Sequence, residues 1–279
     1  MPDQADNLRE LVREALVTAG AAEPVGTCLA VVGSTSGTGA TATLIATAQE
    51  LASLGQRVLA IDANLVRPAL GRQLGLNAAA SLADVLAGRR RLCEATAPAG
   101  FGAALLGVPA PASGIEADSR QRFATELRAA RQRYDAVLID AGSGLSPWAE
   151  WLCRRAAGVL LVASTAHDDV RGAYAVIKSL GGQVATRLVM NKSADGRAAS
   201  AMAQRIGDTA LQFLGCNPLT QAPAVLPPRE TPEDGEYRRA IRLLAAELLT
   251  PRRVSHRRGA AMPAAVPSAA LASTLDTAW

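Results

Sequence analysis

A glycine-rich segment near the start of the chain is the part of the sequence best suited to chemistry. It reads Gly33-Ser34-Thr35-Ser36-Gly37-Thr38-Gly39-Ala40-Thr41 and lies between an apolar run and a stretch with helical periodicity. The backbone N–H groups of such a turn, together with the N-terminus of the following helix, point toward one spot and favour a phosphate group. We therefore predict nucleotide contacts from residues 34–41, with Thr41 also placed to ligate Mg²⁺ when nucleotide binds.

The same segment departs from the nucleotide-binding pattern G-x-x-x-x-G-K-[ST] at two positions. Ser34 stands where the first glycine is expected, and Ala40 stands where the lysine is expected. That lysine contacts the β- and γ-phosphates, where charge is dense. Because Ala40 offers neither charge nor donor, we expect weakened binding of ATP and Mg²⁺ and slow or absent hydrolysis. The alternative is a glycine turn that only packs a strand against a helix.

Polar side chains also follow three later apolar runs. Asp62 ends the run Leu59-Ala60-Ile61, and Asp140 ends the run 136–139. Ligands of open α/β sheets bind outside the carboxyl ends of the strands, so both acids should meet the glycine loop there. We predict that Asp140 holds Mg²⁺ through water and that Asp62, the candidate catalytic residue, positions an attacking water. Asn191 could read an adenine edge, although asparagine is also common in plain turns.

Alternating apolar runs and helical stretches predict the scaffold for these residues. Strands are expected at 28–32, 57–61, 103–108, 136–139, 158–163 and 185–190, and helices at 41–54, 81–86, 116–133, 197–214 and 236–249. This alternation indicates right-handed crossovers and an α/β fold with a doubly wound, mainly parallel sheet and helices on both faces. Few polar residues interrupt the strands, as expected when both faces of a sheet are covered.

The composition divides the chain into three expected segments. Residues 1–24 predict an amphipathic helix and a linker, residues 25–250 the α/β domain, and residues 251–279 a flexible tail that is first basic and then rich in Ala and Pro. The net charge of +4 is mild. Because the basic tail has no interleaved aromatic residues, we expect no specific binding of nucleic acid.

Cysteine spacing and hydropathy indicate where the protein works. The four cysteines are far apart and the chain has two histidines, so we expect buried free thiols rather than zinc, haem or disulfides. No apolar run reaches the roughly 20 residues of a bilayer crossing, and we expect a cytoplasmic location. The amphipathic helix 236–249 precedes a basic segment, so peripheral contact with a membrane surface is one interpretation. We prefer a core-packing helix followed by a solvated tail.

The loop and the strand-end acids, in this order, resemble the MinD/ParA family of dimeric P-loop ATPases. That family carries the loop K-G-G-x-G-K-T, and its two lysine positions are Thr35 and Ala40 here. The other loop residues match the pattern: Gly37, Gly39 and Thr41. The family's D-A-D is Asp62-Ala63-Asn64. The resemblance implies a P-loop NTPase fold, ATP with Mg²⁺, and a homodimer. The departures remove charges that ATP-driven dimerisation and hydrolysis need.

Within that family the chain resembles the FlhG group (also called FleN or YlxH), which regulates flagellar placement and number. The stretch Asp3-Gln4-Ala5-Asp6-Asn7-Leu8-Arg9 is similar to the group's activator motif D-Q-A-x-x-L-R, and residues 140–144, 173–178 and 212–215 also resemble it. The resemblance implies that the N-terminal helix docks on an FlhF-type GTPase and stimulates its hydrolysis. The implied contact residues are Asp3, Gln4, Ala5, Leu8 and Arg9.

A regulator that acts by protein binding is the leading interpretation, and two enzymatic alternatives stay open. A working ATPase switch in positioning or partitioning would need Arg67 or Arg72 to substitute for the absent lysines. A polysaccharide-biosynthesis tyrosine autokinase is suggested by residues 64–68 and 74–76. Such kinases need the loop lysine and a tyrosine-rich tail, whereas no tyrosine follows Tyr237.

Overall fold

The computed structural model describes residues 25–77, 80–109, 115–182, 184–215, 217–219, 221–229 and 235–249. The chain divides into two units, Met1–Leu249 and Thr250–Trp279, and all described residues lie in the first unit. The predicted N-terminal helix with its linker (1–24) and the predicted tail (251–279) lie outside the described residues. The division into three segments therefore stays a prediction.

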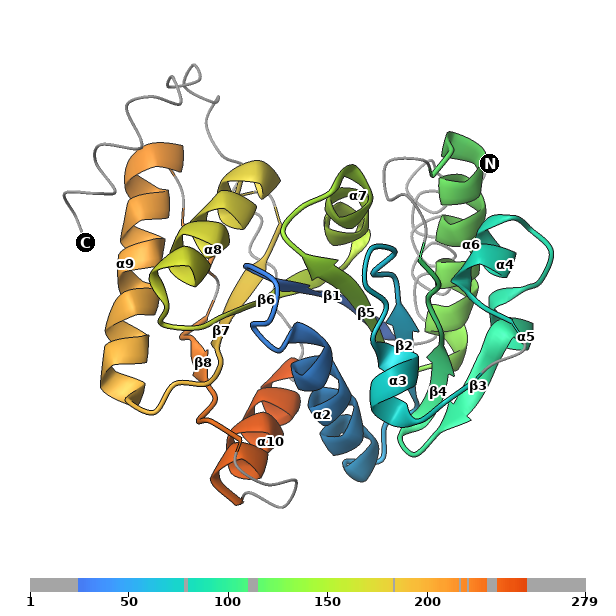
Figure 1. Ribbon diagram of the computed structural model, residues 1–279, viewed down its shortest axis with the longest axis horizontal. Helices are drawn as coiled ribbons and strands as arrows, with labels where there is room; N and C mark the ends of the chain where they lie inside the picture. The colour runs from blue at the N-terminus through green and yellow to red at the C-terminus, as the bar shows by residue number, and fades with distance from the viewer. Residues whose placement is uncertain are drawn as a thin grey trace, which may run out of the picture. The chain divides into compact units, whose positions relative to one another are not determined.

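The strands within the described ranges form one sheet of eight, which is parallel except at one edge (Figure 1). They are β1 Thr27–Gly33, β2 Val58–Asp62, β3 Thr96–Ala99, β4 Gly102–Leu105, β5 Ala136–Ser143, β6 Gly158–Ala163, β7 Thr186–Met190 and β8 Ala224–Val225, in the spatial order β3-β4-β2-β5-β1-β6-β7-β8. The predicted doubly wound, mainly parallel sheet is confirmed. The antiparallel edge strand β3 was not predicted from the sequence, since it is short and contains Pro98, a residue tolerated at sheet edges.

Helices cover both faces of this sheet (Figure 1). They are α2 Ala40–Ser53, α3 Leu70–Leu74, α4 Leu82–Leu86, α5 Leu92–Ala95, α6 Ala117–Arg133, α7 Pro147–Arg155, α8 His167–Leu180, α9 Gly196–Leu214 and α10 Gly235–Leu249. Helices α2, α3 and α10 pack on one face, and α4 to α9 pack on the other. The five helices predicted by residue range are all present, with ends displaced by one residue.

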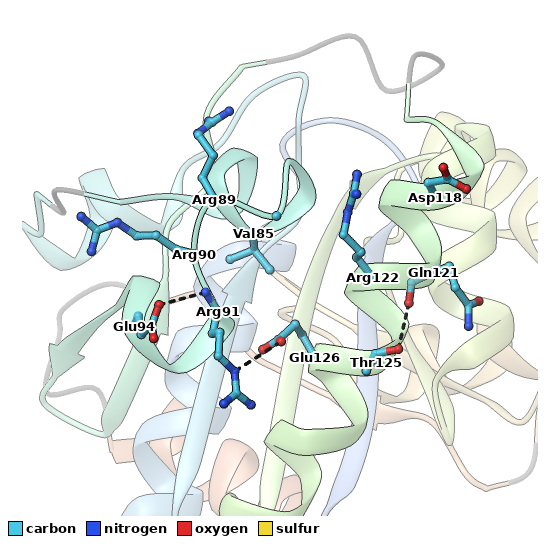
Figure 2. Close-up of a pocket in the computed structure, with 11 residues that line it drawn as sticks. Val85, Arg89, Arg90, Arg91, Glu94, Asp118, Gln121, Arg122, Thr125 and Glu126 are labelled. Atoms are coloured by element: carbon cyan, nitrogen blue, oxygen red, sulfur yellow. Dashed lines mark hydrogen bonds and ion pairs between the residues drawn. The ribbon is translucent and has the colours of Figure 1, made fainter.

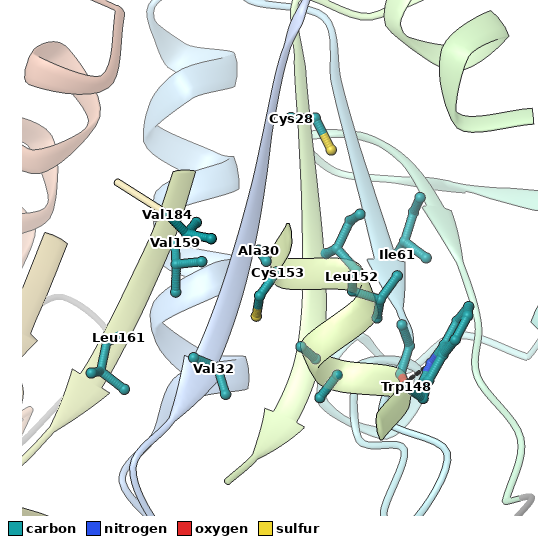
Figure 3. Packing of buried hydrophobic residues seen from close by; sticks show 14 of the residues in the cluster. Cys28, Ala30, Val32, Ile61, Trp148, Leu152, Cys153, Val159, Leu161 and Val184 are labelled. Carbon is teal, nitrogen blue, oxygen red and sulfur yellow. Dashed lines mark hydrogen bonds between the residues drawn. The ribbon is translucent and has the colours of Figure 1, made fainter. Parts of the chain in front are cut away.

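The central strand β1 is buried on both faces, which explains its continuous apolar run. Cys28, Ala30 and Val32 face the α7 side, whereas Leu29 and Val31 face α2. Figure 3 shows the α7 side, where Cys153 of that helix lies close to Ala30 of β1, and Leu152 and Trp148 lie toward β2. Alternate side chains of one strand thereby join two hydrophobic layers.

The cysteines in the described residues are free thiols, as predicted. Cys28 and Cys153 are buried, and Cys93 is half-buried. Burial raises the pKa of the Cys28 thiol to about 11 and that of the Cys153 thiol to about 12. Both thiols therefore stay protonated at neutral pH and act as small apolar side chains.

Helix α10 packs into the core through its apolar side. Tyr237, Ile241 and Leu244 are buried in the same hydrophobic layer as α2, while Leu243 is 61% exposed on the opposite side. The core-packing interpretation of this helix is confirmed, and contact with lipid stays a prediction. Within the described ranges, no helix has both the length and the apolar content needed to cross a membrane.

Candidate functional site

The predicted site residues meet at the carboxyl ends of the central strands. The loop 34–39 leaves β1, and the parallel register places Asp62 of β2 directly beside Asp140 of β5. Asn191 follows the last residue of β7. The structure thus brings the loop, Asp140 and Asn191 together at the strand ends, as predicted, with Asp62 beside Asp140. The predicted partner-binding residues between Asp3 and Arg9 lie outside the described residues.

The loop borders a cavity of about 310 Å³. Residues 35–42 form one wall, and the segments 64–73 and 140–143 supply the rest. Gly37 and Gly39 have φ angles of 91° and 90°, a left-handed conformation that glycine adopts without steric cost. Ser34, the remaining predicted loop contact, is buried, and its hydroxyl has no hydrogen-bond partner within the described residues. These loop contacts with nucleotide stay a prediction.

Two side chains at the end of β7 hold the loop from outside. The Asn191 Nδ2 atom donates to the Thr38 carbonyl at 2.7 Å, and the Lys192 Nζ atom donates to the Gly37 carbonyl at 2.7 Å. A Cβ atom at Gly39 would lie 2.5 Å from Asn191 Nδ2, so this packing requires glycine. The structure thus gives Asn191 a loop-supporting contact, and its adenine contact stays a prediction. The sequence did not predict the contact of Lys192, because the turn after this strand carries no recognisable motif.

The predicted magnesium ligands are in direct contact. Thr41 Oγ1 donates to Asp140 Oδ2 at 2.5 Å, and the Gly142 N–H donates to Asp140 Oδ1 at 2.9 Å. Asp140 is fully buried, and this burial raises the pKa of its carboxyl. A hydroxyl and a carboxylate that acts through water suit Mg²⁺, which prefers oxygen ligands and retains several waters. The donor atoms fit the ion, and the metal site stays a prediction.

Asp62 anchors the chain that follows β2. Its carboxylate accepts hydrogen bonds from the N–H groups of Ala69 and Leu70 at 2.9 Å each, where α3 begins, and from Asn64 N–H at 3.2 Å. The side chain is buried, and this burial raises its pKa to about 6, with the nearby charge of Asp140 adding to the shift. Asp62 does not line the loop cavity. Its water-positioning role stays a prediction.

Asp169 lies beside the loop and contacts Thr35, the residue at the first lysine position of the MinD/ParA pattern. Thr35 Oγ1 and Ser164 Oγ both donate hydrogen bonds to the Asp169 carboxylate in the first turn of α8. Helix α8 approaches closely, since a Cβ atom at Gly172 would lie 2.6 Å from the Ser34 carbonyl oxygen. Sequence reasoning missed Asp169 because only the fold brings residues so far apart in the chain together.

Two arginines from the segment after β2 line the loop cavity. Asn64 and Arg67 close a tight turn, in which Asn64 Nδ2 donates to the Arg67 carbonyl at 2.9 Å and the Arg67 N–H donates to Asn64 Oδ1 at 3.0 Å. From this turn the Arg67 Nη1 atom reaches Ser36 Oγ at 3.4 Å. Arg72 lines the same cavity from α3. The cavity is therefore lined by two arginines although the loop has no lysine.

A second hollow, of about 600 Å³, lies between the α4–α5 segment and α6 (Figure 2). Two of its four arginines form ion pairs: Arg91 lies 3.7 Å from Glu126 of the same groove, and Arg89 lies 2.8 Å from Asp84, next to it. Figure 2 shows Glu94 and Asp118 at its edges. The lining of this groove therefore mixes four arginines with three acidic residues.

Comparison with known proteins identifies the family. No protein-family model matches the sequence. The curated protein "Antiactivator FleN" of Pseudomonas aeruginosa is 30% identical to this chain over 210 residues, which are 70% of this chain and 74% of the relative. The chain belongs to the FleN family. This confirms the resemblance to FlhG, of which FleN is another name.

Solved structures confirm the MinD-like P-loop NTPase fold of this FleN-family chain. The cell division ATPase MinD of Pyrococcus furiosus matches with a TM-score of 0.61 at 22% identity, over 80% of this chain and 98% of that one. The septum site-determining protein MinD of Pyrococcus horikoshii, in complex with Mg-ADP, matches with a TM-score of 0.62 at 21% identity, over 81% and 96%.

Proposed function

We propose that this FleN-family protein regulates flagellar placement and number by binding other proteins, and that its loop hydrolyses ATP slowly or not at all. The observation that carries the regulatory assignment is its membership of the family that includes an antiactivator. The observation that carries slow hydrolysis is the loop itself, in which Thr35 and Ala40 stand at both lysine positions.

The electrostatics of the loop support slow hydrolysis. Phosphoryl transfer is catalysed mainly by positioning and by charge that opposes the phosphate oxygens. Ala40 provides no charge, and the Thr35 hydroxyl is engaged by Asp169, which adds a negative group close to the loop. Removing one group that stabilises transition-state charge typically costs about 10²–10³-fold in rate. Binding of ATP and Mg²⁺ is accordingly weaker than in a loop that carries lysines.

The partner in this proposal is an FlhF-type GTPase, contacted by Asp3, Gln4, Ala5, Leu8 and Arg9. In such a contact, the Gln4 amide can orient the attacking water, and the Arg9 guanidinium can offset phosphate charge in trans. The support is the similarity of residues 3–9 to the activator motif of the family.

GTP hydrolysis by an FlhF-type GTPase, measured with and without the full chain, tests this role. We expect the chain to accelerate hydrolysis and the variants Gln4→Ala and Arg9→Ala to lose most of that effect. Gln121→Ala, an exposed glutamine on α6, is the matched control and should stimulate like the unaltered chain. Absent stimulation, or equal stimulation by Gln4→Ala, would reject the role.

An ATP-dependent switch in positioning is the second candidate, and one observation favours it. Arg67 and Arg72 line the loop cavity, which gives the site positive charge from outside the loop. Measuring ATP turnover by the purified chain separates the two candidates. Turnover that disappears in Asp140→Ala would favour the switch, whereas turnover at the background rate supports regulation through binding. Homodimerisation and contact with a membrane surface stay predictions in either case.

A further inference from the structure

We propose that Arg67 and Arg72 together supply the positive charge that the loop lacks, so that the cavity holds the phosphate groups of a nucleoside di- or triphosphate. This inference deepens the proposed function, because it concerns the same loop and rests on the weakened nucleotide site described there. Binding through these arginines can be measured separately from stimulation of a GTPase.

The backbone of the loop is arranged for phosphate without any lysine. Gly37 and Gly39 adopt the left-handed conformation that the turn needs, and Asn191 with Lys192 fixes two carbonyl groups from the β7 side. The N–H group of each of these peptide units points away from its carbonyl. Together with the N-terminus of α2, this backbone provides donors for phosphate oxygens but no full positive charge.

Arg67 is held at the rim of this loop by its own turn. The two hydrogen bonds with the Asn64 side chain fix the Arg67 backbone, so the guanidinium starts from a defined position. Its Nη1 atom lies 3.4 Å from Ser36 Oγ, which is part of the cavity wall. A guanidinium is planar and presents paired donors that match phosphate oxygens, so it can bind phosphate from the side of the loop.

Arg72 belongs to the same anchored segment. It lies in α3, and the buried Asp62 carboxylate accepts hydrogen bonds from the Ala69 and Leu70 N–H groups at the start of that helix. The segment that carries both arginines is thereby fastened to the carboxyl end of β2. The buried Asp62 carboxylate therefore acts as a positioning residue for Arg67 and Arg72.

The charges of these arginines are available to a ligand. Within the described residues, no carboxylate lies within ion-pair distance of Arg67 or Arg72. Two arginines of the groove in Figure 2 differ in this respect, because Arg91 lies 3.7 Å from Glu126 and Arg89 lies 2.8 Å from Asp84, next to the groove.

Calorimetric titration of the full chain with ADP and ATP in the presence of Mg²⁺ tests the inference. We expect measurable binding, and a roughly 10-fold or larger increase in Kd for Arg67→Gln and for Arg72→Gln, since each removes hydrogen bonds to a charged group. Arg67→Lys keeps the charge and should weaken binding less than Arg67→Gln. Arg128→Gln loses the same charge at an exposed position of α6 outside the cavity and should leave Kd unchanged.

A rescue experiment makes the test specific. Adding Ala40→Lys to the double variant Arg67→Gln/Arg72→Gln should bring Kd back toward that of the unaltered chain, because the lysine restores charge at the loop. Unchanged thermal unfolding of the double variant shows that its fold is intact. Absence of nucleotide binding by the unaltered chain at millimolar concentration, or unchanged Kd in the double variant, would overturn the inference. GTPase stimulation that persists in either case would leave the proposed function standing.

Discussion

Asp62 gives this fold a pH dependence that one substitution can isolate. The side chain is 1% exposed. Burial raises its pKa from 3.8 to about 6, and the charge of Asp140 adds to the shift. Because the folded chain holds this proton more tightly than the unfolded chain, ionisation of Asp62 opposes folding. The stabilising contribution of protonated Asp62 is complete below pH 3.8 and is lost as the pH rises through about 6.

The size of this effect follows from the shift. A difference of about 2 pKa units corresponds to about 3 kcal/mol of unfolding free energy. Of this, about 2 kcal/mol should be lost between about pH 4.5 and pH 7, and almost none above pH 7. Asp62→Asn carries no charge at any of these pH values, so its unfolding free energy should lack this component.

Urea unfolding at a series of pH values measures the difference between the two chains. The difference removes the contributions of most other acids, which are common to both, although Asp140 is adjacent and its pKa should fall slightly in the variant. The side-chain amide introduced by Asp62→Asn would also place an NH₂ donor against a backbone N–H donor. This loss of a hydrogen bond costs about 1–3 kcal/mol at every pH. The test is therefore how the difference in unfolding free energy between the two chains changes with pH. A difference that stays constant across this range, or that changes in the opposite direction, would refute the argument.

Three further substitutions test the loop and the hydrophobic core. Gly39→Ala should destabilise the fold by about 1–3 kcal/mol, because its φ is 90° and the new Cβ would lie 2.5 Å from Asn191 Nδ2; unchanged chemical denaturation would contradict this packing. Trp148→Ala should lower the unfolding free energy by about 3–5 kcal/mol in the same measurement, since the ring is 1% exposed and its Nε1 atom donates to the Ala63 carbonyl at 3.0 Å. A loss below about 1 kcal/mol would show that the core relaxes around the gap. Ala40→Lys alone should lower the Kd for Mg-ATP by about tenfold through one charged contact; calorimetry that shows equal or weaker binding would mean that the loop cannot direct a lysine to phosphate.

Local patterns in the sequence predicted the central sheet and the strand-end position of the site. The apolar runs that precede Asp62 and Asp140 place both acids at one edge, because parallel strands end together. The edge strand β3 and the short helix α3 were missed, since four or five residues with mixed polarity show no clear periodicity. Contacts that depend on distant segments, such as Asp169 with Thr35, have no local signal at all.

The shape of the loop and its charge are determined by different residues, so one can be retained while the other is lost. Gly33 is required by packing, since a Cβ atom there would lie 2.6 Å from Thr38 Oγ1. Asn191 and Lys192 hold the loop through the Thr38 and Gly37 carbonyl groups, and these two hydrogen bonds do not involve the side chain at position 35 or 40. A chain can therefore exchange both lysines without loss of the turn. Because transfer of phosphate depends on the charge, we expect such a chain to lose hydrolysis before it loses the shape of the nucleotide site. Nucleotide held there by Arg67 and Arg72 would then stabilise the folded chain by mass action instead of being consumed.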